Sequence, residues 1–146
     1  MRIGRLTRLS LCALLAGCTQ PARPLAIPPA GNVARIDFTR WSGTENQGMV
    51  RIHDREQVER ILALLALNNA GYFRRRYRFG PGEPTGQQYS IAVQGELSVP
   101  LVVWVGPDWL GGVDETVEKD GWRQARYRPL GPAERAELLR ACGGVP

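Results

Sequence analysis

Histidine and cysteine are scarce in this chain, which has one histidine and three cysteines among 146 residues. A zinc site takes three or four nitrogen or sulfur ligands, so this composition leaves little with which to build one. The motifs G-x-S-x-G, S-x-x-K, H-E-x-x-H and C-x-x-C and the P-loop are also absent. These absences argue against the common hydrolase, metallopeptidase, thiol-redox and nucleotide-binding chemistries, and we expect no metal and no cofactor.

Lysine is nearly absent as well, because Lys119 is the only lysine among 19 basic residues. The formal net charge is +5, but three of the arginines fall in the first eight residues. The remaining chain has 16 basic and 14 acidic residues, a net charge of only +2. This balance gives no reason to expect a nucleic-acid partner. The length, with 43% hydrophobic and 23% charged residues, fits one small globular domain.

The N-terminal residues have the order of a secretory signal. Residues 1–8 carry three arginines and no acid, and residues 9–17 are apolar but too few to span a bilayer, which takes about 20. The apolar stretch ends in Leu15-Ala16-Gly17-Cys18, which resembles the lipobox of bacterial lipoproteins. The resemblance implies diacylglyceryl transfer to the sulfur of Cys18, cleavage before it and acylation of the new amino group. The alternative is an ordinary cleaved signal followed by a chance cysteine.

The resemblance also implies a location and a division of the chain. Thr19 follows the cysteine, and the lack of Asp there implies the outer membrane, with the protein facing the periplasm and held by acyl chains on Cys18. We divide the chain into a signal peptide (1–17), the acylated cysteine with a Pro-rich tether (18–32) and a globular domain (33–146). Because the tether has four prolines, it excludes helix and central strand. We expect it to hold the domain on the order of 40 Å from the lipid.

Hydrophobic alternation predicts the strands of the domain. They are expected over 34–39, 49–53, 72–79, 89–93, 97–105 and 122–128, with a short return strand at 109–110 and an acidic loop over 114–121. Pro100, inside the most apolar strand, indicates an edge position or a bulge.

Two helices are predicted from their end signals. Asp54 and Gln57 form a capping-box pattern before an apolar stripe that consists of Val58, Ile61, Leu62, Leu65 and Leu67. Gly131-Pro132 opens a C-terminal helix running through Cys142. Helices and strands do not alternate, so we expect an α+β fold. It would be a single small domain with an antiparallel sheet, one helix packed on a face and a C-terminal helix, in the order ββα-βββ(β)-α.

The densest basic run is interleaved with aromatic residues. On a strand, Arg74, Arg76 and Arg78 share one face at intervals of about 7 Å, and we call these three residues the arginine stripe. The aromatic residues Phe73, Tyr77 and Phe79 would then share the other face, toward the core. The stripe is our candidate site for an anionic envelope component, such as lipid phosphate, lipopolysaccharide or cell-wall polymer, or for an acidic protein face. The alternative is a solvated face that pairs with the acids of the domain itself.

Tryptophan is frequent for so small a domain, with residues at 41, 104, 109 and 122. We expect Trp104 in the core. Trp109 lies beside a Gly-Pro-Asp turn and Gly111-Gly112, so it is the candidate exposed anchor for a partner. The alternative is that Trp109 is simply a large core residue.

His53 is the only side chain expected to titrate near neutral pH, and Asp54 follows it. Adjacent strand residues point to opposite faces, so a structural role is expected for both.

The acids Asp114, Glu115, Glu118 and Asp120 suggest calcium. However, the EF-hand pattern with Gly121 sixth would begin at Thr116 and end at Tyr127, and neither is a carboxylate. A solvated loop is therefore expected.

Cys142 is the only other cysteine left after processing. We expect a buried small apolar side chain in a monomeric protein. The alternative is an intermolecular disulfide that links two copies.

These features predict a membrane-anchored, non-catalytic binding module for an envelope component or a protein. One alternative is an inhibitor or immunity-type lipoprotein that neutralises a toxin or hydrolase, which rests on analogy of size and place. Another is a hydrolase with paired carboxylates, which would have to be matched in space.

Overall fold

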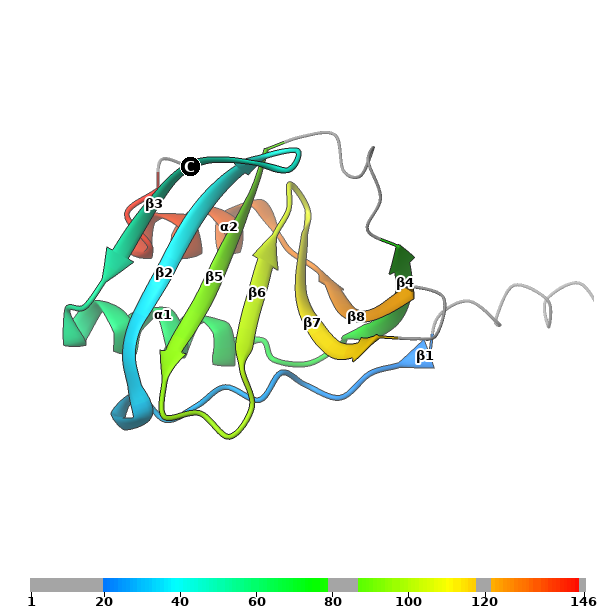
Figure 1. Ribbon diagram of the computed structural model, residues 1–146, viewed down its shortest axis with the longest axis horizontal. Helices are drawn as coiled ribbons and strands as arrows, with labels where there is room; N and C mark the ends of the chain where they lie inside the picture. Colours follow the sequence, from blue (N-terminus) through cyan, green and yellow to red (C-terminus); the bar gives the residue numbers. More distant parts are fainter. Residues whose placement is uncertain (1–19, 79–86, 118–121, 145–146) are drawn as a thin grey trace, which may run out of the picture.

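An eight-stranded sheet is the main feature of the fold (Figure 1). The structure is a computed structural model, and it describes residues 20–78, 87–117 and 122–144. The side chains of residues 75–78, 87, 113–117 and 122–124 lie outside this description. The elements are β1 (Gln20–Pro21), η2 (Ala30–Asn32), β2 (Val33–Ser42), β3 (Glu45–Ile52), α1 (Arg55–Leu67), β4 (Phe73–Arg78), β5 (Gln87–Gly95), β6 (Leu101–Val105), β7 (Trp109–Val117), β8 (Trp122–Pro129) and α2 (Pro132–Ala141).

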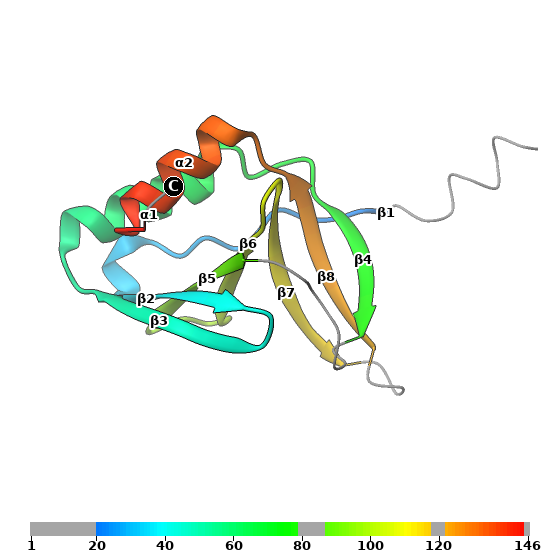
Figure 2. The same ribbon diagram turned by 90° about the horizontal axis from the view of Figure 1, so that it is seen from above.

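The sheet is antiparallel, with its strands in the order β1-β4-β8-β7-β6-β5-β2-β3. Figure 2 shows both helices on one side of the sheet, above β2 and β5, while β7, β8 and β4 run steeply away. The α+β class is therefore confirmed. The finer order was only roughly predicted, because five strands separate the two helices and the extra strand β1 precedes them.

The helix signals in the sequence were reliable because they act locally. The Asp54 side chain accepts a hydrogen bond from the Gln57 amide at 2.8 Å and caps α1. Val58, Ile61, Leu62 and Leu65 are buried, as the stripe predicted. Leu67 is 72% exposed, so its assignment to the stripe was wrong. It lies two residues beyond Leu65 and therefore on the opposite side of a helix with 3.6 residues per turn.

Two strand predictions were wrong around the centre of the sheet. β6 begins at Leu101, after Pro100, and lies between β5 and β7 rather than at an edge. Proline has no amide hydrogen for the ladder and is left outside it. The return strand at Trp109 continues to Val117, so Asp114 and Glu115 belong to a strand and not to a loop. The rest of the expected acidic loop, 118–121, lies outside the described residues.

The core fills the space between the helices and the sheet. Its fully buried members come from both layers and include Ile36, Ile91, Val103, Ile61, Leu65 and Leu139. Burying a side chain of this size contributes about 1.5–3 kcal/mol, so this layer supplies most of the stability of the domain.

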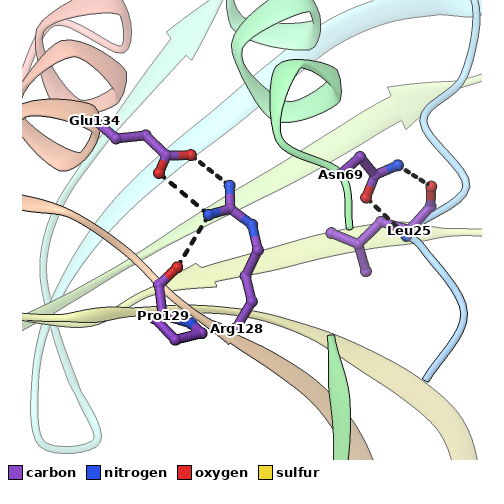
Figure 3. A network of polar contacts seen from close by, with 5 residues as sticks. All are labelled: Leu25, Asn69, Arg128, Pro129 and Glu134. Atoms are coloured by element: carbon purple, nitrogen blue, oxygen red, sulfur yellow. Dashed lines mark hydrogen bonds and ion pairs between the residues drawn. The ribbon is translucent and has the colours of Figure 1, made fainter. Parts of the chain in front are cut away.

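The segment expected to act as a free tether is bound to the domain instead. We call residues 20–32 the strap. Leu25 is buried in the core cluster, and its backbone amide and carbonyl both bond to the Asn69 side chain, at 3.0 and 2.7 Å (Figure 3). The Ala22 amide also donates to the Tyr72 carbonyl at 2.9 Å. A proline-rich segment is excluded from α-helix, but its carbonyls and apolar side chains can still make contacts with the rest of the domain.

Candidate functional site

The arginine stripe lies on β4, as predicted, but its face was predicted wrongly. Arg74 pairs with Arg126 of β8, which pairs with Gly112 of β7, and Gly112 pairs with the buried core residue Val103. Directly paired residues share a face of a sheet, so Arg74 belongs to the face that carries the helices. The helices lie over β2 and β5, far from β4, and leave this end of the sheet to the strap (Figure 2). Phe73 consequently lies on the helix-free face and not toward the core.

The structure describes the side chain of only one member of the arginine stripe, Arg74. Arg74 is exposed. Arg76 and Arg78 occupy alternate positions of β4, opposite Gln124 and Trp122, which places them on the face of Arg74. Their side chains, and the whole of Phe79, lie outside the described residues.

Two arginines of β8 on this same face bind the rest of the domain. The Arg126 guanidinium donates to the carbonyls of Arg23 and Pro24, at 3.2 and 2.7 Å, and holds the strap down. Arg128 is only 5% exposed and forms a two-pronged ion pair with Glu134 of α2, while also donating to the Pro129 carbonyl (Figure 3). Sequence analysis did not single out either residue. The carbonyls that Arg126 binds lie about 100 residues away in the chain, whereas Glu134 lies only six residues beyond Arg128, across the turn from β8 to α2.

Arg128 lies beside the buried Tyr72, and each residue affects the pKa of the other. The guanidinium carbon lies 5.8 Å from the ring centroid of Tyr72. Burial raises the pKa of Tyr72, and the nearby Arg128 only partly opposes that rise. Burial alone would lower the pKa of Arg128, but its interactions with Glu134 and Tyr72 outweigh burial and raise it. This cluster therefore holds β8 to α2 as a charged but compensated core contact.

The helix-free face carries an unexpected group of aromatic side chains. One cross-strand row runs Phe73, Tyr127, Gly111, Trp104, Ser90, Thr39 and Met49, with one residue from each of seven strands. Trp41 and Trp109 flank this row. We call Phe73, Tyr127, Trp104, Trp41 and Trp109 the aromatic row, and all five are half-buried. Trp104 was predicted in the core, but it occurs on the opposite face because its strand neighbours Val103 and Val105 take the core positions.

Contacts between the rings fix their arrangement. The centroids of Phe73 and Tyr127 are 6.5 Å apart, and Trp109 meets Tyr127 edge-on at 5.2 Å. At the other end, Trp41 packs on Trp104 at 5.9 Å and donates from its indole nitrogen to the Ser90 hydroxyl at 2.9 Å. Such pairs are favourable beyond the area they bury and hold the rings in a fixed arrangement.

Glycines make room for this arrangement on both faces of β7. A Cβ at Gly111 would lie 2.9 Å from the Tyr127 ring, and a Cβ at Gly112 would lie 2.3 Å from the Leu25 side chain. Neighbouring glycines thus let a ring approach one face and the strap approach the other. Glycine within a strand is a sequence signal for such close approach, and it was available here.

Trp109 was predicted to begin a short return strand, and it was also the candidate exposed anchor beside a turn. It does begin β7, and its ring lies over Gly106, where a Cβ would be 2.2 Å away. It is half-buried, so both the exposed-anchor and the core interpretations were too extreme.

The surroundings of the remaining candidates fit structural roles for His53, Asp54 and Cys142. His53 is exposed, and Asp54 caps α1 as expected. Cys142 is fully buried at the end of α2, and burial raises the pKa of its thiol to about 12. An intermolecular disulfide requires an accessible thiolate, so burial weighs against that alternative. Within the described residues, no group of three or more His, Cys, Asp or Glu side chains is arranged to hold a metal ion.

No helix in the described part of the chain is long and apolar enough to cross a membrane. No protein-family model matches this chain, and no curated protein or solved structure matches it either.

Proposed function

We propose that the protein is an acylated lipoprotein of the bacterial envelope, anchored through Cys18 in the outer membrane, whose domain binds a partner without catalysis. The binding surface in this proposal is the aromatic row. The partner is an envelope component or a protein, and tryptophan and tyrosine suit either because each joins an apolar ring to one polar atom.

The observation that carries this proposal is the position of the aromatic row. Five aromatic residues lie together on the one face of the sheet that neither helix covers. Aromatic residues are strongly enriched among the residues that dominate binding at interfaces. The rings form two partly exposed groups on this face, one around Tyr127 and one around Trp104, and exposed apolar groups of this kind are typical of a binding surface.

Three of the described carboxylates are engaged in ion pairs with basic side chains. Asp37 pairs with Arg35 at 3.0 Å, Glu59 pairs with Arg55 at 2.8 Å, and Glu134 pairs with Arg128. Each of these acids has a basic partner, whereas a carboxylate-dependent hydrolase needs two acids facing one substrate.

The test is retention of a partner from envelope extract by the chain 18–146 carrying Cys18→Ser. This chain must include the strap, because the strap is part of the fold. We expect Trp104→Ala to weaken retention about tenfold or more, as at an interface hot spot. Leu67→Ala is the control, since it removes an exposed apolar side chain from α1.

Equal retention by both variants, or no partner for the parent chain, would contradict the proposed surface. The identity of the retained partner separates the two binding hypotheses. A toxin or hydrolase that loses activity when bound would establish the inhibitor or immunity role instead.

A further inference from the structure

The aromatic row consists of two groups of rings with a defined spacing. The Tyr127 group contains Tyr127, Phe73 and Trp109, and the Trp104 group contains Trp104 and Trp41. Tyr127 and Trp104 lie on either side of Gly111, and both pair with it. Neighbouring strands of a sheet are about 4.8 Å apart, so the backbone positions of Tyr127 and Trp104 are about 10 Å apart. A ligand that contacts both groups is therefore extended and presents an apolar surface to each.

This face of the sheet is uncharged where the structure describes it from β4 across to β5. Cross-strand pairing with Trp104 identifies the residues of these strands that share its face. None of those whose side chains are described is charged. Besides the aromatic row they are apolar residues and the uncharged polar residues Gln88, Ser90 and Gln94. The described arginines of β4 and β8 all lie on the other face, and they are Arg74, Arg126 and Arg128.

Uncharged rings and polar groups of this kind are complementary to a neutral sugar chain. The face of an aromatic ring is electron-rich, and a sugar ring presents weakly positive C–H groups on its flat sides and hydroxyl groups at its rim. Such C–H groups make weak but favourable contacts with electron-rich acceptors. A neutral amide, such as that of the exposed Gln94, can bond to a hydroxyl group. An anionic polymer or an acidic protein face would call for basic side chains, and none is described on this part of the face.

We propose that the aromatic row binds an uncharged, extended glycan chain of the kind found in chitin and cellulose, with one sugar stacked on each group of rings. In such a chain every second sugar presents the same side, and this repeat is similar in length to the spacing of the two groups. The site consists of described residues only, and the undescribed side chains of β4, β7 and β8, such as Arg75, are left out of it. This inference rests on the proposed function, because it names the partner of the same surface.

The first test measures binding of chitohexaose and cellohexaose, two uncharged extended hexasaccharides, to the chain 18–146 carrying Cys18→Ser by isothermal titration calorimetry. We expect binding of at least one of them, with an affinity that changes less than about twofold up to about 0.5 M NaCl, because a neutral ligand has no charge to screen. The matching disaccharide reaches only one group of rings and should bind at least about tenfold more weakly. Binding by neither hexasaccharide, or equal affinities for hexasaccharide and disaccharide, would overturn the proposal.

The second test weakens one group of rings at a time. Trp104→Ala in one group and Phe73→Ala in the other should each weaken hexasaccharide binding about tenfold. Each should also remove most of the advantage of the hexasaccharide over the disaccharide, since a single group is left to stack on. Leu67→Ala, on the exposed side of α1, is the control and should leave both affinities unchanged. Circular dichroism shows that each variant is folded, and unchanged hexasaccharide binding by the folded variants would overturn the proposal.

The two proposals for this surface can fail separately. A parent chain that binds neither hexasaccharide but retains an envelope protein in a Trp104-dependent manner would overturn the glycan partner and leave the proposed function standing. A parent chain that binds no hexasaccharide and retains nothing from the extract would overturn both.

Discussion

Replacing Gly112 by alanine tests whether the strap belongs to the folded domain. The new Cβ would lie 2.3 Å from the Cδ2 atom of Leu25, which is buried, so Leu25 must move. Overpacking of this kind costs about 1–3 kcal/mol. If the strap detaches instead, the domain loses about 2 kcal/mol of Leu25 burial. It also loses two hydrogen bonds to Asn69, worth about 1 kcal/mol each.

The less costly of these two responses sets the effect, so we expect Gly112→Ala to lower the free energy of unfolding by about 1–3 kcal/mol, measured by urea denaturation. Gly31→Ala is the matched control, because a Cβ there meets nothing within 4 Å and the residue has no positive φ. Substitution at such a site is neutral or slightly stabilising. A Gly112→Ala effect no larger than that of Gly31→Ala would refute the packing of the strap on β7.

A double-mutant cycle makes the test specific to one contact. Leu25→Ala alone should cost about 2–3 kcal/mol, since it removes a buried side chain. In the Gly112→Ala background it also removes the clash, so the two costs should fall short of additivity by about 1 kcal/mol or more. Strict additivity would show that the alanine at 112 acts on something other than the strap.

Three further predictions concern the core and the aromatic row. Burial raises the pKa of Cys142 from 9.0 to about 12. The free energy of unfolding should therefore stay constant below about pH 9 and fall by up to about 4 kcal/mol as the pH rises toward 12. Cys142→Ala should remove that fall from unfolding curves measured at alkaline pH. Glu134→Gln leaves Arg128 buried without its anion, so thermal unfolding should show a loss of about 2–3 kcal/mol, against almost none for the exposed Glu137→Gln. Gly111→Ala should displace the Tyr127 ring, shift tryptophan emission and weaken partner retention about tenfold; unchanged retention with shifted emission would argue against the row as the binding surface.

Features whose causes lie within a few residues could be predicted from the sequence. The Asp54 cap, the buried stripe of α1 and the proline at the start of α2 all depend on neighbours along the chain. Strand positions followed from alternation, and the α+β class followed from the order of elements. The acylation of Cys18 also rests on a short local pattern, and it stays a prediction.

The sites depended on contacts between distant residues. The sequence marked Arg74, Arg76 and Arg78 as one face of a strand, but it could not show which face of the sheet they join. That depends on pairing with β8, some 50 residues away in the chain. The aromatic row was likewise invisible, because its five rings come from five strands between residues 41 and 127.

The strap shows most clearly how local sequence and tertiary contacts each contribute to the structure. Four prolines argue, within the sequence, that residues 19–32 form neither α-helix nor central strand. Whether such a segment extends into solvent or binds its own domain is not a property of the segment. It is decided by Asn69, which bonds both polar groups of the Leu25 backbone, and by Gly112, which leaves space for the Leu25 side chain. Only the folded sheet brings these residues together, because local chain geometry sets the conformations a segment can adopt and tertiary packing selects among them.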